Sequence, residues 1–172
     1  MSKQVKLFLF LFSSILFIGC DHVSKELAKE HLKDRAPRSY YHDTFRLEYV
    51  ENTGAFLSFG DNWSKTVSFW TMSIIPLIIL VAIFIYAIRR VGNHSFWSLF
   101  PFVLIVSGGL GNIIDRIVYD RHVTDFLNLG INNLRTGIFN LADLYVTAGV
   151  IMLFFFQFRK PVVDKKVDQL IS

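Results

Sequence analysis

Two aspartates stand in stretches of this sequence that are otherwise apolar. Asp125 lies in VTDF, and Asp143 lies in FNLADL with Asn140 three residues before it. Asn112 and Arg116, in SGGLGNIIDR, are spaced to share one face of a helix. Two facing carboxylates in a low-dielectric site cannot both stay ionised and so share a proton. Such a pair can activate water with one carboxylate and protonate a substrate carbonyl with the other.

Asp143 is the strongest of these signals, because it falls about one turn inside the apolar segment 138–158. A carboxylate inside a membrane span costs about 2.5–3.5 kcal/mol and usually faces the bundle interior with a function. Asp125 alone is typical of a solvated loop, and Asp115 beside Arg116 is typical of a helix-end pair. The chain between the third and fourth apolar segments returns to the same membrane face, so Asp125 and Asp143 are predicted to meet there.

The composition indicates an integral membrane protein, since 52% of the 172 residues are hydrophobic and 18 are phenylalanine. The net charge of +4 comes from basic residues flanking apolar runs, which favours a role in membrane orientation over nucleic-acid binding. A single cysteine excludes an internal disulfide and a cysteine-based zinc site, and the five histidines form no ligand pair at helical spacing. We therefore expect no metal and no other cofactor.

Four membrane-spanning helices are predicted, since a bilayer core about 30 Å thick needs about 20 apolar residues per helix. They cover residues 7–20, 67–88, 96–114 and 138–158. The first run is short, and we expect helix-forming residues 24–32 to extend it until Pro37. Pro76 is expected to kink the second helix. The glycines at 108, 109 and 111 would let another helix approach the third closely.

The basic residues predict the orientation of this four-transmembrane-helix bundle. They cluster before the first span, between the second and third, and after the fourth, at Lys3, Lys6, Arg89, Arg90, Arg159 and Lys160. The positive-inside rule places these regions and both termini in the cytoplasm. The chain is then one membrane domain over residues 1–172, with a disordered cytoplasmic tail at 161–172. Segments 36–60 and 115–137 lie on the outer face.

The outer segment 36–60 is predicted to hold a small β-sheet. TFRLEYVE alternates apolar and charged residues, which is typical of a half-buried strand. NTG then signals a turn, and AFLSFG reads as a second short strand. Segment 115–137 is expected to be a loop, with or without a short helix.

The stretch LFIGCD, residues 16–21, is similar to the end of a lipoprotein signal sequence. Phe17, however, occupies the third place before Cys20, where a lipobox usually has leucine. The residues that follow continue a helix instead of a flexible tether. We therefore interpret the stretch as part of an uncleaved first span, with Cys20 as a small buried packing residue.

Five motifs in order along the chain resemble the bacterial lipoprotein signal peptidase family, signal peptidase II. They are DHVSK (21–25), ENTGAFLSFG (51–60), GGLGNIIDR (108–116), VTDF (123–126) and FNLADL (139–144). The resemblance implies a four-helix inner-membrane aspartic endopeptidase with a small periplasmic sheet and an active site at the outer face. It also implies a substrate, a prolipoprotein cut just before a cysteine that carries diacylglycerol. The peptide antibiotic globomycin would inhibit it, and the family suggests a monomer.

Carried onto this chain, the resemblance implies a catalytic dyad of Asp125 and Asp143. Residues in supporting or substrate-contacting positions would be Asp21, Lys25, Asn52, Gly54, Asn112, Arg116 and Asn140. Asp115 matches the motif as well, and we expect it to be structural and paired locally. Two other classes are open from the residues alone. Asp143 and Arg116 could mark the polar path of a small transporter or channel subunit, and LFIGCD could mark a structural membrane lipoprotein.

Overall fold

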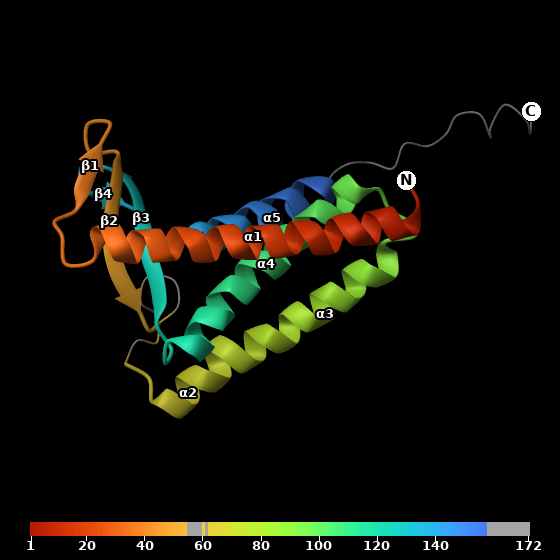
Figure 1. Ribbon diagram of the computed structural model, residues 1–172, viewed down its shortest axis with the longest axis horizontal. Helices are drawn as coiled ribbons and strands as arrows, with labels where there is room; N and C mark the ends of the chain where they lie inside the picture. Colours follow the sequence, from red (N-terminus) through yellow and green to blue (C-terminus); the bar gives the residue numbers. More distant parts are fainter. Residues whose placement is uncertain (55–59, 61, 158–172) are drawn as a thin grey trace, which may run out of the picture.

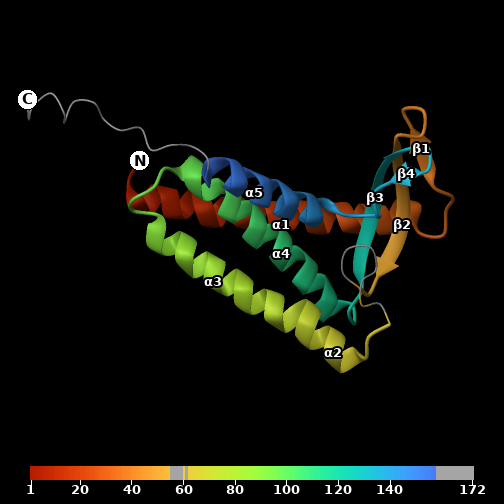
Figure 2. The ribbon, with the colours of Figure 1, turned by 180° about the vertical axis from the view of Figure 1, so that it is seen from behind.

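The computed structural model describes residues 1–54, 60 and 62–157, and shows a bundle of long helices with a small β-sheet at one end (Figure 1). The helices are α1 (Lys3–Leu32), α2 (Lys65–Phe69), α3 (Ile75–Arg90), α4 (Phe96–Val118) and α5 (Leu141–Gln157). The strands are β1 (Arg38–Tyr40), β2 (Phe45–Asn52), β3 (Val123–Ile131) and β4 (Leu134–Arg135). The first residues of α1 and the last turn of α5 both point to the end of the bundle away from the sheet (Figures 1 and 2).

The predicted helical membrane protein is confirmed. Within the described ranges, three helices are long and apolar enough to cross a membrane: Lys3–Leu32, Lys65–Arg90 and Phe96–Val118. The apolar helix α5 is shorter. The second of these helices runs through α2 and α3 and includes a π-helical turn at Trp70–Ile74, directly before Pro76. A proline lacks the N–H that a regular helix needs there, so the irregular turn lies where the kink was expected.

The fourth helix begins later than predicted, at Leu141 instead of residue 138. Phe139 is held as an extended residue, since its N–H donates to Leu127 O (2.8 Å) and its O accepts from Leu127 N (2.8 Å). This bridge to β3 delays the helix, so Asp143 lies in the first turn of α5. The first helix extends to Leu32, as expected.

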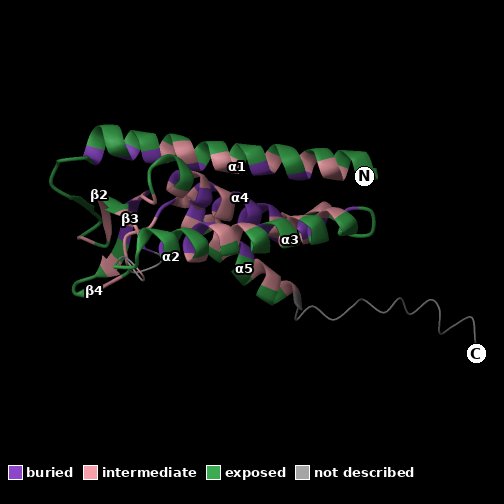
Figure 3. Cartoon of the chain, turned by 90° about the horizontal axis from the view of Figure 1, so that it is seen from below, coloured by how far each residue is buried: buried purple, intermediate pink, exposed green. Residues whose placement is uncertain are grey.

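Helix α4 is the centre of the bundle, and its glycines allow the other helices to approach closely. A Cβ atom at Gly108 would collide with α5 at Val146, and one at Gly109 would collide with α3 at Leu80. One at Gly111 would collide with the carboxylate of Asp21 on α1. Buried residues lie on the sides of the helices that face α4, whereas the outer side of α1 is exposed (Figure 3). That outer side carries large apolar residues such as Phe8 and Phe12, as expected of a lipid-facing surface.

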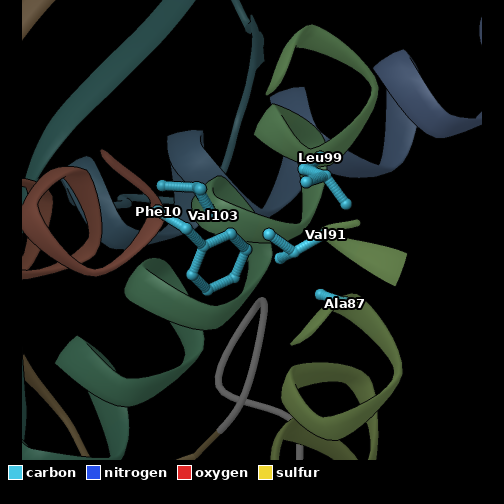
Figure 4. Packing of buried hydrophobic residues seen from close by; sticks show 5 residues of the cluster. All are labelled: Phe10, Ala87, Val91, Leu99 and Val103. Atoms are coloured by element: carbon cyan, nitrogen blue, oxygen red, sulfur yellow. The ribbon is translucent and has the colours of Figure 1, made fainter. Parts of the chain in front are cut away.

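A buried apolar cluster fastens α1, α3 and α4 at the end away from the sheet. Figure 4 shows its five members, Phe10, Ala87, Val91, Leu99 and Val103. Toward the sheet, α3 diverges from α1 (Figures 1 and 2). The bundle is thus closed by packing at one end and splayed at the end where the polar residues lie.

The sheet is antiparallel in the order β1-β2-β3-β4. The strand predicted in TFRLEYVE is present as β2. Its long partner β3 comes from segment 115–137, which was wrongly expected to be a loop or helix. In the register of β2 and β3, Val50 stands opposite Asp125 and Asn52 opposite Val123. Two other predictions lie outside the described residues. They are the strand expected in AFLSFG, of which only residue 60 is described, and the tail at 161–172.

The sheet rests on the C-terminal end of α1, because Phe126 of β3 packs with Ala28 and Leu32. Cys20, expected to be a buried packing residue, is instead exposed on α1. It continues the outward-facing side of that helix, where lipid takes the place of protein packing. The helix runs unbroken through it, as expected for an uncleaved span.

Candidate active site

Asp125 and Asp143 face one small pocket at the end of the bundle that carries the sheet. The pocket has a volume of about 30 Å³, and we call it the dyad pocket. Its lining residues are Asn52, Asn112, Arg116, Val123, Asp125, Ile138 and Asp143. Asp125 reaches it from β3 and is 3% exposed, whereas Asp143 reaches it from the first turn of α5 and is partly exposed.

Each of the two carboxylates accepts hydrogen bonds from neutral amide groups. Asp125 Oδ1 accepts from Asn140 Nδ2 (2.7 Å), and Asp125 Oδ2 accepts from Asn52 Nδ2 (3.0 Å). Asp143 Oδ1 accepts from Asn112 Nδ2 (2.7 Å), and Asp143 Oδ2 accepts from the backbone N–H of Asn140 (3.2 Å). Amide donors hold the carboxylates in place without adding a neutralising charge. The carboxylates therefore remain available for proton transfer.

Asn140 and Asp143 also form a reciprocal cap at the start of α5. Asn140 Oδ1 accepts from the backbone N–H of Asp143 (3.0 Å), while Asp143 Oδ2 accepts from the backbone N–H of Asn140. This arrangement has the spacing of a capping box, in which each side chain satisfies one unpaired N–H of the first turn. The cap fixes the position of Asp143 on the helix end. The three-residue spacing seen in FNLADL thus has a structural cause as well as a chemical one.

Arg116 and Gly54 close the dyad pocket from the side of the outer loop. The guanidinium of Arg116 donates from Nη2 to Gly54 O (2.8 Å) and from Nη1 to Asn112 O (3.3 Å). Gly54 N donates to Asn52 Oδ1 (2.9 Å), which holds the Asn52 amide with its Nδ2 toward Asp125. The motifs ENTG and GNIIDR, far apart in sequence, therefore meet over the two carboxylates.

The electrostatic environment makes Asp125 a weaker acid than an ordinary aspartate. Burial raises the pKa of Asp125 to about 6, and the nearby Asp143 carboxylate also raises it. The hydrogen bonds from Asn52 and Asn140 and the charge of Lys25 act in the opposite direction. Asp125 can thus exchange a proton near neutral pH, as a group engaged in acid–base chemistry requires.

Asp21, Lys25 and Asp115 form a second buried cluster on the far side of Asn112, which we call the lysine cluster. Lys25 Nζ lies 2.7 Å from Asp21 Oδ2 and 2.6 Å from Asp115 Oδ2. Asp115 was expected to pair locally, but its partner is Lys25 of α1. The reason is the helical turn of about 100° between adjacent residues, which directs Arg116 to the dyad pocket and Asp115 to α1. Asp21 Oδ1 also accepts a hydrogen bond from the backbone N–H of Ala142 (2.8 Å). The sequence could not predict this bond, because every residue type except proline carries a backbone N–H.

A larger groove of about 640 Å³ is lined in part by Asp143. Its walls are mainly apolar and come from the second helix, α4, α5 and the sheet; they include Met72, Pro76, Ile113, Leu129, Phe139, Leu144 and Val146. Asn112, Arg116 and Asp143 line both the groove and the dyad pocket. The apolar wall residues were not singled out from the sequence, because they are of the same types as lipid-facing residues.

Among the described residues, no group of three or more His, Cys, Asp or Glu side chains is placed to hold a metal ion. The chemistry that the site itself offers is that of two carboxylates sharing a proton. In such a site one carboxylate acts as a base toward water, while the other acts as an acid toward a carbonyl oxygen.

Comparisons with known proteins identify the family of this chain. The Peptidase A8 family, described as signal peptidase (SPase) II, matches residues 13–159. The lipoprotein signal peptidase of Borrelia duttonii (strain Ly) is 37% identical over 151 residues, covering 83% of this chain and 87% of that protein. That of Borreliella burgdorferi (strain ZS7) is 35% identical over 172 residues, covering 95% and 98%. That of Streptococcus agalactiae (strain NEM316) is 34% identical over 144 residues, covering 81% and 85%.

The fold is that of a solved bacterial membrane enzyme. One structure of it, at 2.3 Å resolution, superposes with a TM-score of 0.70 at 23% identity, covering 90% of this chain and 94% of that one. The sequence match spans four of the five helices completely and most of the first, and includes both aspartates of the dyad pocket. This chain therefore belongs to the signal peptidase II family, the aspartic peptidases of family A8 that cleave the signal peptides of prolipoproteins.

Proposed function

We propose that this signal peptidase cuts diacylglyceryl-modified prolipoproteins just before the lipidated cysteine, with Asp125 and Asp143 as its catalytic dyad. One observation carries the assignment of the dyad. Two carboxylates held by neutral amide donors share a pocket at the end of an apolar groove. The family match decides against a transporter or channel subunit.

The reaction requires one protonated and one ionised carboxyl group. The ionised carboxylate takes a proton from water as the water oxygen attacks the scissile carbonyl carbon. The protonated carboxyl donates its proton to the carbonyl oxygen, which gives a neutral tetrahedral intermediate. Collapse of the intermediate breaks the C–N bond: the carboxyl group that took the water proton donates it to the leaving amine, and the ionised carboxylate takes back a hydroxyl proton of the intermediate as the new C=O bond forms, which restores the dyad. Arg116 and the amide side chains of Asn52 and Asn112 line the pocket and would hold the substrate backbone.

The groove supports entry of the substrate sideways from the lipid. A signal peptide is an apolar helix, and the modified cysteine carries two acyl chains, so both need an apolar path to the scissile bond. The groove offers that path between the second helix and α5, with α4 behind it. Leu129 and Thr136 from the sheet line its outer part. A substrate seated there would displace water from the groove, which strengthens the electrostatic interactions at the dyad.

The distribution of basic residues supports a site on the outer face of the inner membrane. Lys3, Lys6, Arg89 and Arg90 lie at the end of the bundle away from the sheet and the dyad pocket. The positive-inside rule places that end in the cytoplasm. The active form is proposed to be a monomer, as the family resemblance implies. A globomycin-type peptide would inhibit by occupying the groove.

The test is cleavage of a diacylglyceryl-modified prolipoprotein by purified protein, with and without globomycin. Asp125→Asn and Asp143→Asn should each lose at least about 10³-fold in kcat while remaining inserted and folded, because each removes one proton-transfer group. Asp120→Asn is the matched control, since Asp120 is exposed, pairs with Lys65 at 2.7 Å and lies outside the pocket. Wild-type turnover by a folded Asp125→Asn or Asp143→Asn variant would disprove the dyad.

A further inference from the structure

Lys25 is buried directly behind the dyad pocket, although it makes no contact there with either carboxylate of the dyad. The residue is 4% exposed. Its ammonium group has three oxygen neighbours: Asp21 Oδ2 at 2.7 Å, Asp115 Oδ2 at 2.6 Å and Asn112 Oδ1 at 3.0 Å. Only the last of these belongs to the dyad pocket. Lys25 therefore joins the lysine cluster to an amide that holds Asp143.

The bond from Lys25 determines which way the Asn112 amide points. Asn112 Oδ1 accepts from Lys25 Nζ and from Asn140 Nδ2 (3.1 Å), which leaves Asn112 Nδ2 directed at Asp143 Oδ1. In the flipped orientation the Asn112 NH₂ group would face the ammonium and the oxygen would face the Asp143 carboxylate. Both contacts would be repulsive, because the ammonium has only donors and the ionised carboxylate only acceptors.

The second carboxylate is linked to the same network through Asn140. Asn140 Nδ2 lies 3.1 Å from Asn112 Oδ1 and 2.7 Å from Asp125 Oδ1. A flip of the Asn112 amide would remove the acceptor for Asn140 and place two NH₂ groups against each other. The orientation of one amide thus affects the hydrogen bonds of both Asp143 and Asp125.

The lysine cluster also holds Lys25 firmly and fixes the start of α5. Asp21 and Asp115 lie on either side of the ammonium and are 0% and 1% exposed. Asp21 uses its other oxygen to accept the backbone N–H of Ala142, the residue before Asp143. Lys25 is consequently held in place by two charged partners, with one donor direction left for Asn112.

We propose that Lys25 is a positioning residue for catalysis, which fixes the Asn112 amide and through it the geometry of Asp143 and Asp125. This inference rests on the proposed dyad. It assigns to Lys25 a role beyond joining α1 to α4, since an ion pair with Asp115 alone would accomplish that. Loss of the bond to Asn112 should therefore lower kcat and leave KM nearly unchanged.

The charges around Lys25 predict a second readout. The groups that face it are Asp21 on α1 and Asp115 on α4, with His22 beyond Asp115 (Nδ1 to Oδ1, 3.5 Å). At longer range its charge lowers the pKa of Asp125. Without that charge the dyad holds its protons more tightly, so the ionised carboxylate is lost at higher pH. The acid limb of the kcat profile should then move to higher pH in Lys25→Met.

Four variants separate positioning from charge and from folding. Lys25→Met removes both the charge and the bond to Asn112. Lys25→Met combined with Asp115→Asn removes the same bond but leaves the net charge of the cluster unchanged, and it avoids leaving two buried carboxylates without a cation. Asp115→Asn alone keeps Lys25 and its bond to Asn112. Lys29→Met is the matched control one turn along α1, where Lys29 lies over the Tyr119 ring at 5.3 Å from its centroid.

The measurement is kcat, KM and the pH profile with a diacylglyceryl-modified prolipoprotein, normalised to folded protein. The double variant should lose about tenfold to hundredfold in kcat with KM within about twofold, as expected for a misplaced catalytic group. Lys25→Met should show the same fall and a shifted acid limb. Asp115→Asn should give less folded protein, but the folded fraction should keep kcat within about threefold of the wild type. Lys29→Met should match the wild type.

A folded double variant with wild-type kcat would overturn the positioning role. An equal fall in kcat for Asp115→Asn would also overturn it, because looser packing of α1 on α4 would then explain both. Failure of the dyad is distinguishable from this outcome. If Asp125→Asn or Asp143→Asn keeps cleaving, the proposed dyad fails; if both are inactive and the double variant is wild type, only the role of Lys25 fails.

Discussion

Two pairs of buried aspartates lie on opposite sides of Asn112, and they differ in what binds them. Asp21 and Asp115 have an ammonium between them at 2.7 and 2.6 Å. Asp125 and Asp143 accept hydrogen bonds from neutral amides. In the first pair one ammonium contacts both carboxylates directly. In the second pair the nearest cation, Arg116, lines the pocket but donates to the backbone oxygens of Gly54 and Asn112, and two carboxylates without a cation in contact favour sharing a proton. The residue type is the same in the two pairs, so the partner and the access to the carboxylate decide whether it serves the fold or the chemistry.

The two pairs also differ in access. The pair around Lys25 is packed between α1, α4 and the start of α5. Lys25 and Asp115 line a pocket of about 90 Å³, yet both carboxylates are at most 1% exposed. The other pair lines a pocket that continues into the apolar groove through Asp143. A carboxylate that acts on a peptide bond must be accessible to the substrate. An ion pair is stronger where water is excluded, because water screens the attraction between the charges.

The largest expected effect on stability comes from removing one aspartate of the lysine cluster. Asp21→Ala removes a buried partner of Lys25 and the acceptor for Ala142 N–H, so it should destabilise the protein by about 3–5 kcal/mol. Equilibrium unfolding in detergent would measure this loss. Asp120→Ala, which breaks the exposed pair with Lys65, should have little effect on stability, because water screens that pair. Equal losses in the two variants would mean that burial of the pair has no energetic consequence.

In the dyad pocket, Asp125 should instead make the free energy of unfolding depend on pH. The pKa of Asp125 is raised to about 6 in the folded protein from an ordinary value of 3.8. The folded state therefore binds the proton more tightly. The stability that this proton contributes is fully present below about pH 4 and is lost as the pH rises through about 6. In Asp125→Asn the side chain stays neutral, so relative to wild type it should gain up to about 3 kcal/mol between pH 4 and pH 7.

The matched comparison for this pH effect is Asp120→Asn. Lys65 lowers the pKa of Asp120, first by a hydrogen bond and then by its charge, so its contribution has the opposite sign. That stability is present above the unfolded pKa and is lost as the pH falls. Unfolding of both variants and the wild type across this range would test the contrast. A constant difference between Asp125→Asn and wild type would contradict the raised pKa of Asp125.

The smallest of these effects is expected from removing an amide that donates to a carboxylate of the dyad. Asn52→Ala removes the hydrogen bond to Asp125 Oδ2 (3.0 Å), which lowers the pKa of Asp125. We expect about a tenfold fall in kcat, equivalent to about 1.4 kcal/mol, and an acid limb moved to higher pH. Steady-state cleavage assays at several pH values would show both. Asn133→Ala, on the exposed turn between β3 and β4, should change neither. If the acid limb of Asn52→Ala matched that of the wild type, the amide would have no electrostatic role.

The sequence predicted the helices well because their signal is local. A membrane span is recorded in the length and apolarity of one continuous segment, and the alternation in residues 45–52 likewise records a strand. The start of α5 was misplaced by three residues, because Phe139 is held extended by a partner in β3. Segment 115–137 was misjudged for the same reason, since the long strand β3 depends on pairing with distant β2.

For the candidate site, the residue types and spacing of Asp125, Asp143, Asn112 and Asn140 were enough to predict a shared-proton carboxylate pair. They could not predict that Asp115 pairs with Lys25, or that Cys20 faces outward. Side chains adjacent on one helix point about 100° apart, and their partners come from other helices. The sequence by itself determined the membrane bundle and the chemical groups available to it. Only the tertiary structure decided which aspartates received a cation and which received amides, because that choice depends on contacts between segments far apart in the chain.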